Sequence, residues 1–290
     1  MKKNIIAIVY DFDGTLSPLP MQEYTVLPKI PIDPKQFWTE VRSENTQHGG
    51  EEIITYMMLM LKKANDAKVR ITKADLGRLA SQISYYPGVE DFFERINEFV
   101  ANRSRGKARV RHYIISSGLK EILCKISIKR FFHNIFASEY AYDHYGAAQY
   151  PKLVVTDTVK TQFLFRINKG REKITESINE SMGEELRPIP FQNMVYIGDG
   201  MTDVPCMTVT TKNGGYAIAV YKQRSRKGLR VCRSLIKGDR VGFIATADYC
   251  KNSELEKYLQ VTLECIIEGI KYRSAQEEMI KKRVLQKVGQ

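Results

Sequence analysis

The chain has 290 residues, which is enough for a substantial core in one large domain or two smaller ones. Its hydrophobic fraction of 43% and charged fraction of 27% are typical of globular proteins and argue against a disordered chain. No stretch approaches the ~20 apolar residues of a membrane span, and the apolar run 5–10 is too short for a signal peptide. We therefore expect a cytoplasmic protein that does not contact a membrane.

The five cysteines are far apart and include no CxxC pair. Their odd number and wide spacing argue against a disulfide framework and exclude a zinc ribbon. We expect reduced thiols, as in a reducing compartment.

The net charge of +12 would suit nucleic acid, a membrane surface or an anionic substrate. Much of the excess lies in the segment 222–233 and in the last residues, including Lys281, Lys282 and Arg283. Neither segment has the interleaved aromatic residues of a platform for single strands. We therefore expect solvated basic faces and do not expect a nucleic-acid partner.

Short apolar runs and helical patterns alternate along most of the chain. The predicted strands are 5–10, 110–115, 134–138, 194–197, 216–220 and 243–247. Helical spacing covers 36–41, 51–64, 72–83, 90–100, 160–167 and the tail from 253, with another helix from about 120. This alternation predicts an α/β fold with a doubly wound, parallel, Rossmann-like sheet. The helical block 17–86 interrupts it, so we expect a core of 1–16 and 87–290 with an inserted α-helical cap.

Polar side chains follow three of the predicted strands, and another begins the predicted helix 160–167. They are Asp11, Asp13, Ser116, Lys160, Asp199 and Asp203. Carboxyl ends of parallel strands meet at one edge of the sheet, so we expect one site there. Four carboxylates in one crevice repel each other unless a cation is present, and all-oxygen ligands favour Mg²⁺. None of the four histidines follows a strand, which disfavours zinc.

These motifs resemble those of the haloacid dehalogenase-like (HAD) hydrolase superfamily. The segment Asp11-Phe-Asp-Gly-Thr15 is similar to its first motif and Ser116 to its second, while Lys160 and the segment 198–203 are similar to the third and fourth. The resemblance covers residues 5 to about 220. The long insertion before Pro87 is similar to the helical cap of phosphoserine phosphatase-like members.

The resemblance implies a Mg²⁺-dependent phosphatase. Asp11 would be the nucleophile that forms an aspartyl-phosphate, and Asp13 would exchange protons with the leaving group and with water. The pair projects to the same side of an extended chain. Because an oxygen leaving group needs a proton, Asp13 favours a phosphatase or phosphomutase over a dehalogenase.

The remaining motifs would bind phosphate and metal. Ser116, with backbone groups near Ser117 and Gly118, would bind phosphoryl oxygens, Thr15 would orient the carboxylates, and Lys160 would neutralise developing charge. The metal would be held by Asp11, the Asp13 carbonyl and Asp199, with Asp203 as a ligand or support.

Several alternatives stay open at this point. Lys152 competes with Lys160 for the role of the site lysine, and Lys169 lies further along. The expected substrate is a small phosphorylated metabolite, but a sugar-phosphate phosphomutase and a non-catalytic basic binding protein are alternatives. Glu23, Arg42 and Arg78 of the cap could contact a charged group of the substrate, although surface charge is the default expectation. No oligomeric state is predicted.

Overall fold

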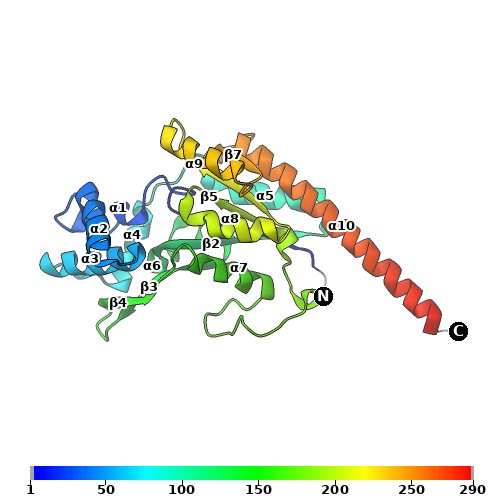
Figure 1. Ribbon diagram of the computed structural model, residues 1–290, viewed down its shortest axis with the longest axis horizontal. Coiled ribbons are helices and arrows are strands. Elements are labelled where there is room, and N and C mark those ends of the chain that lie inside the picture. Colours follow the sequence, from blue (N-terminus) through cyan, green and yellow to red (C-terminus); the bar gives the residue numbers. More distant parts are fainter. Residues whose placement is uncertain (1–2, 289–290) are drawn as a thin grey trace.

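The computed structural model describes residues 3–288 and has a seven-stranded sheet with helices on both faces (Figure 1). The strands are β1 (Ile5–Tyr10), β2 (Arg109–Leu119), β3 (Phe132–Tyr142), β4 (Ala148–Leu153), β5 (Met194–Gly198), β6 (Tyr216–Tyr221) and β7 (Phe243–Thr246). The helices are α1 (Met21–Tyr24), α2 (Pro34–His48), α3 (Glu52–Asp66), α4 (Lys73–Leu79), α5 (Val89–Arg103), α6 (Lys120–Leu123), α7 (Val159–Lys169), α8 (Val204–Lys212), α9 (Arg226–Lys237) and α10 (Glu254–Val288).

The strand order is β4-β3-β2-β1-β5-β6-β7. The chain moves outward from β1 to one edge and later from β5 to the other, so the order reverses beside β1. All neighbouring pairs are parallel except β3 with β4. The predicted doubly wound α/β fold is therefore confirmed, and the point where the order reverses is where such sheets bind ligands.

Strand β1 is buried along its whole length, as its uninterrupted apolar sequence predicts. Ile6, Ile8 and Tyr10 face a cluster that includes side chains of α5 and α10. Ala7 and Val9 face a second cluster, which includes side chains of α7, α8 and α9. Two apolar layers thus fix β1 at the centre of the molecule and hold the residues after it in place.

Helices α1 to α4 form a group at one end of the molecule, between β1 and α5 in the sequence (Figure 1). Thr72 caps the start of α4, as its spacing to Asp75 predicted, and its hydroxyl accepts a 3.1 Å hydrogen bond from the backbone N–H of Asp75. The group contacts the hairpin of β3 and β4, where the Ala148 N–H donates to the Ile71 carbonyl at 2.9 Å.

Three elements of the core were not predicted from the sequence. Strand β4 adds an antiparallel edge to the predicted parallel sheet, and it contains Pro151, which is tolerated in edge strands. Helices α8 and α9 were not predicted either. The predicted basic segment 222–233 lies in a loop and most of α9.

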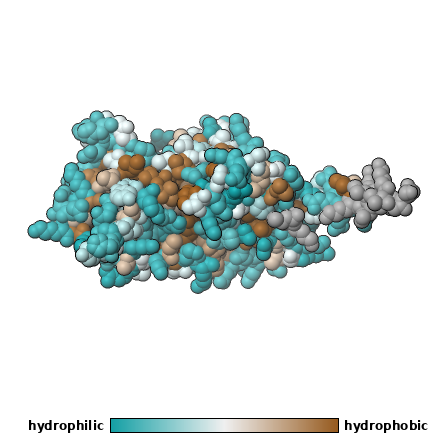
Figure 2. All heavy atoms as spheres, turned by 90° about the horizontal axis from the view of Figure 1, so that it is seen from below, coloured by the Kyte–Doolittle hydropathy of each residue, from teal (hydrophilic) through white to brown (hydrophobic). Residues whose placement is uncertain are grey.

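Helix α10 starts against the sheet and projects from the body at the end opposite to α1–α4 (Figure 1). The side chains of Lys281 and Arg283, part of the predicted basic tail, lie outside the described residues. Among the described residues, no helix has both the length and the apolar character needed to cross a bilayer. The face seen from below is mostly hydrophilic, with hydrophobic residues gathered near its middle (Figure 2).

Candidate active site

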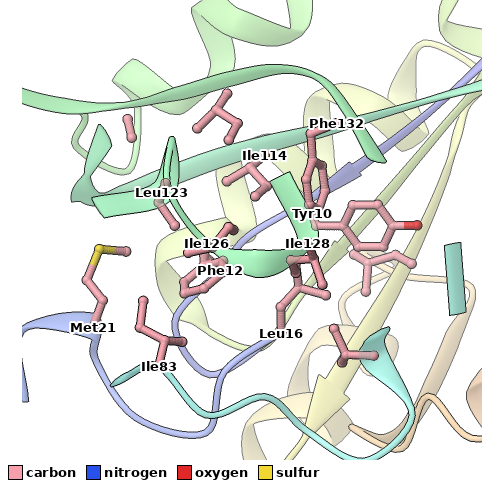
Figure 3. Close-up of a cluster of buried hydrophobic side chains, with 14 of the residues drawn as sticks. Tyr10, Phe12, Leu16, Met21, Ile83, Ile114, Leu123, Ile126, Ile128 and Phe132 are labelled. Carbon is pink, nitrogen blue, oxygen red and sulfur yellow. The ribbon is translucent and has the colours of Figure 1, made fainter. Parts of the chain in front are cut away.

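The turn after β1 positions the first two acidic residues. The Asp11 N–H donates to the Ile197 carbonyl at 2.9 Å, so the chain stays paired with β5 for one residue beyond the strand. Phe12 is fully buried and points into an apolar cluster (Figure 3). Gly14 then adopts a φ of +85°, which is the left-handed conformation that glycine tolerates best. The carboxyl of Asp11 is thereby held at the edge of the sheet, where it is 5% exposed.

Lys160 of α7 connects two carboxylates that are far apart in the sequence. Its Nζ donates to Asp11 Oδ1 at 2.9 Å and to Asp203 Oδ1 at 2.8 Å, and all three residues are buried. Burial alone would lower the pKa of Lys160, but the two carboxylates outweigh it and raise this pKa well above its usual value. The ammonium is therefore charged and offsets part of the negative charge around it.

The third carboxylate completes an acidic cluster at the same edge. One oxygen from each of Asp11, Asp199 and Asp203 lies within 4.8 Å of the others. Burial raises the pKa of Asp11 to about 6, although Lys160 counteracts this shift. The pKa of Asp199 is raised well above its usual value by burial and by the charge of Asp11. Such mutual repulsion among oxygen donors is relieved by a bound hard cation.

Asp203 is held by three donors. Its Oδ1 accepts from Lys160 and from the Tyr196 hydroxyl, each at 2.8 Å, while its Oδ2 accepts from the Asp199 N–H at 3.2 Å. Gly198 is required beside it, because a Cβ there would lie 2.4 Å from Asp203 Oδ2. Tyr196 was not predicted as a site residue, since a tyrosine in a buried strand is usually a core residue. Its hydroxyl, which needs a partner when buried, was the signal that could have indicated it.

Asp13 lies at the boundary between the sheet and the α1–α4 group. Its Oδ1 accepts a 2.9 Å hydrogen bond from the N–H of Met21, at the start of α1. Burial and the charge of Asp11 raise the pKa of Asp13 well above its usual value. A carboxyl in this environment favours its protonated form, as a proton donor requires.

The segment 116–118 belongs to the end of β2, which extends beyond the predicted strand 110–115. The Ser116 hydroxyl accepts a 3.0 Å hydrogen bond from the Gly118 N–H and is buried. A Cβ on Gly118 would lie 3.2 Å from Asp13 Oδ2, so this segment borders the carboxylates. Thr15 is also fully buried, and its carbonyl accepts from Tyr249 at 2.9 Å.

Geometry separates the competing lysines. Lys152 lies on β4, where its side chain is 57% exposed and pairs with Glu139 at 2.7 Å. Lys169 donates to the backbone carbonyls of Ile178 and Glu180. Of the three lysines, Lys160 is the one hydrogen-bonded to Asp11.

A cavity of about 690 Å³ opens between the sheet edge and the α1–α4 group. It is lined by Asp13, Pro20, Gln22, Glu23, Pro34, Lys35, Trp38, Thr39, Arg42, Glu52, Ile53, Tyr56, Ser117 and Gly118. The Tyr56 hydroxyl donates to the Ser117 carbonyl at 2.9 Å, and the Trp38 indole donates to Glu23 at 2.9 Å. Both polar groups are thus occupied. Of the four site carboxylates Asp13 alone lines this cavity, which extends from it to a partly aromatic wall.

Two of the three charged residues of the segment 17–86 that were singled out from the sequence border this cavity. Glu23 and Arg42 line it, whereas Arg78 is 74% exposed and pairs with Asp75. The cavity volume is within the range of small-molecule sites.

The chain is similar in sequence to known proteins. The sequence model of the haloacid dehalogenase-like hydrolases matches residues 8–208. An uncharacterized protein of Borreliella burgdorferi is 28% identical over 283 residues, which cover 89% of this chain and 96% of that protein.

Two solved structures share the fold. A HAD family hydrolase from Salmonella enterica serovar Typhi superposes with a TM-score of 0.57 at 14% identity, over 89% of this chain and 70% of that one. A phosphoserine phosphatase with an analogue of the phospho-aspartyl intermediate superposes with a TM-score of 0.55 at 15% identity, over 89% of this chain and 99% of that one.

Proposed function

The chain belongs to the haloacid dehalogenase-like hydrolase family, and from that premise we propose that it is a Mg²⁺-dependent phosphomonoester hydrolase that forms an aspartyl-phosphate on Asp11. The observation that carries the proposal is the buried contact of Lys160 with both Asp11 and Asp203. It holds the Asp11 carboxylate at the sheet edge, beside the cavity that Asp13 lines.

Asp11 is the proposed nucleophile. Its Oδ1 is hydrogen-bonded to Lys160, so attack on phosphorus falls to Oδ2. The bond from phosphorus to the leaving oxygen breaks as the bond from Asp11 to phosphorus forms. The Lys160 ammonium stabilises the negative charge that develops around the phosphoryl group.

Asp13 is the proposed acid and base. In its protonated form it gives the leaving oxygen its proton, and the resulting carboxylate then takes a proton from the water that attacks phosphorus. The bond from phosphorus to Asp11 breaks in this second step, which releases inorganic phosphate and restores the Asp11 carboxylate. The hydrogen bond from Met21 keeps this carboxyl oriented towards the cavity side of the turn.

Residues at the end of β2 are proposed to bind the phosphoryl oxygens. Gly118 lies next to Asp13 and its N–H donates to the Ser116 hydroxyl, while Ser117 and Gly118 line the cavity. Thr15 is proposed to support the turn after β1 from its buried side, because Thr15 is buried and does not line the cavity.

The donor set fits Mg²⁺. Carboxylate oxygens of Asp11 and Asp199, together with the Asp13 carbonyl, are proposed as ligands. Because three donors already occupy Asp203, we assign it to support Lys160 and Asp199. When bound, the ion supplies positive charge that offsets these carboxylates and the phosphoryl oxygens.

Residues 17–86 are proposed to act as a cap that selects the leaving group. The cavity of about 690 Å³ suits a small phosphorylated metabolite. A cytoplasmic location stays a prediction.

Hydrolysis of p-nitrophenyl phosphate tests the proposal. We expect activity that requires Mg²⁺, disappears with a chelator, and falls at least about 10⁴-fold in Asp11→Asn. The matched control is Asp33→Asn at the start of α2, which should keep its activity. Intact-protein mass after an acid quench should detect one phosphoryl group on the parent protein and none on Asp11→Asn.

Equal rates for Asp11→Asn and the parent would overturn the assignment of the nucleophile. A phosphomutase would instead hydrolyse p-nitrophenyl phosphate weakly and need a bisphosphate activator. A non-catalytic binding protein would not hydrolyse it at all.

A further inference from the structure

Helix α9 and the loop before it hold an unusual concentration of positive charge. Residues 222–237 include seven cations and no carboxylate, whereas the net charge of the whole chain is +12. The cations are Lys222, Arg224, Arg226, Lys227, Arg230, Arg233 and Lys237. More than half of the excess charge is therefore confined to one surface element.

These seven side chains are all exposed, and within the described residues none of them forms an ion pair or a side-chain hydrogen bond. Other surface cations of the chain do find partners, such as Lys63 with Glu40 and Lys271 with Glu268. Like charges four residues apart destabilise a helix by a few tenths of a kcal/mol per pair. Helix α9 carries this cost with no compensating contact inside the molecule.

The packing of α9 arranges its cations in a row. Cys232 and Leu235 are buried against the sheet, which fixes the rotation of the helix about its axis. The opposite face then carries Arg226, Arg230, Arg233 and Lys237 at steps of four, three and four residues. At a rise of ~1.5 Å per residue the row is about 16 Å long.

We propose that this row binds the phosphodiester backbone of a nucleic acid without reading its sequence. A straight series of cations, mostly arginines, complements a linear polyanion with regularly spaced charges. The helix has no aromatic residue on which a base could stack, so the contacts would be with phosphates alone.

Nucleic acid fits this surface better than a lipid bilayer does. A helix that lies in a membrane interface inserts its apolar face among the lipids. The apolar face of α9 is instead covered by the sheet, and Ile236, at 38%, is its one large apolar residue exposed to that extent. From the sequence alone, this basic segment was interpreted as a solvated face. The row of cations without partners, which the structure reveals, favours a binding surface instead.

The row begins at the catalytic edge of the sheet. The loop 222–225 follows β6, and Asp199 follows the neighbouring strand β5, with Gly198 and Ala219 paired. A bound strand would thus pass beside the active site, but the interaction does not depend on the proposed phosphatase activity.

Fluorescence anisotropy with labelled single-stranded and duplex oligonucleotides tests the proposal. We expect binding by the parent protein at low salt and a loss of at least about tenfold in R226E/R230E/R233E. The slope of log affinity against log salt should become shallower by about 2 to 3, which corresponds to three lost phosphate contacts. The charge-matched control K62E/K73E/K257E changes three exposed lysines elsewhere and should keep most of the affinity.

A second variant, R226Q/R230Q/R233Q, removes the charges without reversing them and should lose affinity in the same direction. Circular dichroism and unchanged hydrolysis of p-nitrophenyl phosphate would verify that the variants fold. The proposal is overturned if the parent protein does not bind at low salt or if the control loses as much affinity as R226E/R230E/R233E. Binding to phosphatidylserine vesicles with no binding to oligonucleotides would also overturn it, in favour of a lipid surface.

Discussion

The Tyr196 hydroxyl donates a 2.8 Å hydrogen bond to Asp203 Oδ1, the same atom that accepts one from Lys160. This places a phenol behind the carboxylate that positions the site ammonium. Tyr196 is fully buried and does not line the cavity beside Asp13. Its influence on the reaction therefore passes through Asp203 and Lys160.

Tyr196→Phe should reduce kcat for p-nitrophenyl phosphate by about three- to thirtyfold and leave KM nearly unchanged. The ring still fills its space, but Asp203 loses a donor, which costs about 1 kcal/mol and loosens Lys160. Steady-state kinetics at saturating Mg²⁺ would measure both constants. An unchanged kcat, or a rise in KM without a change in kcat, would contradict this role.

In the presence of a chelator, the free energy of unfolding of Lys160→Met should be about 3 to 5 kcal/mol lower than that of the parent. The substitution leaves Asp11 and Asp203 buried without their cation. The variant should also lose nearly all hydrolytic activity. Urea denaturation and the p-nitrophenyl phosphate assay would measure these effects.

Lys152→Met is the matched control for that variant. The Lys152 side chain is 57% exposed, and Glu139 keeps a second ion pair with Lys120 at 2.7 Å, so the loss of stability should be about 0 to 1 kcal/mol. Should Lys152→Met lose as much activity as Lys160→Met, the assignment of the site lysine would have to be revised.

The elements that carry the site were the most predictable part of the fold. The run 5–10 is apolar throughout, so its burial and its central place followed from composition alone. Strand β4 was missed because Pro151 and several exposed residues hide the pattern of an edge strand. Helix α9 was missed because its charges dominate the sequence and its buried face is narrow.

Within the site, sequence order predicted which residues follow strands but could not supply distances. The choice of Lys160 over Lys152 depends on which helix approaches Asp11, and that is set by packing between distant segments. The contact of Tyr196 with Asp203 has the same origin, because it joins a strand to the 3₁₀ turn before α8.

Gly14→Ala should weaken the Mg²⁺ dependence of activity, with a higher Mg²⁺ concentration needed for half-maximal rate. A Cβ at this position would lie 2.2 Å from Asp199 Oδ2, so the proposed ligand would have to move. The φ of +85° adds about 1 kcal/mol of backbone strain. Mg²⁺ titrations of the p-nitrophenyl phosphate rate would measure the change.

Gly49→Ala separates the two effects. Gly49 also has a positive φ, of +65°, but a Cβ there meets nothing within 4 Å. Gly49→Ala should therefore lose about 1 kcal/mol of stability through backbone strain alone and keep the Mg²⁺ dependence of the parent. If the Mg²⁺ concentration for half-maximal rate rose equally in both variants, backbone strain alone would explain the result for Gly14→Ala.

The stability of the protein should fall in mild acid partly because of His112. Its Nδ1 lies 3.1 Å from the Tyr10 hydroxyl and its Nε2 lies 3.1 Å from Asn97 Oδ1, so the neutral ring can accept at one nitrogen and donate at the other. Burial lowers the pKa of His112 to about 3 from its usual 6.5. The unfolded chain therefore takes up a proton near pH 6.5 that the folded protein does not, and folding loses about 1.4 kcal/mol per pH unit below that point.

Urea denaturation of the parent and of His112→Gln between pH 7.5 and 5 would measure this contribution. The difference in unfolding free energy between them should shrink by about 2 kcal/mol as the pH falls from 6.5 to 5, because only the parent carries this histidine. Other groups, such as Asp11 with its raised pKa, titrate in both proteins and cancel in the difference. His48→Gln, at an exposed position, should follow the parent at every pH, and a constant gap between His112→Gln and the parent would rule out the buried neutral ring.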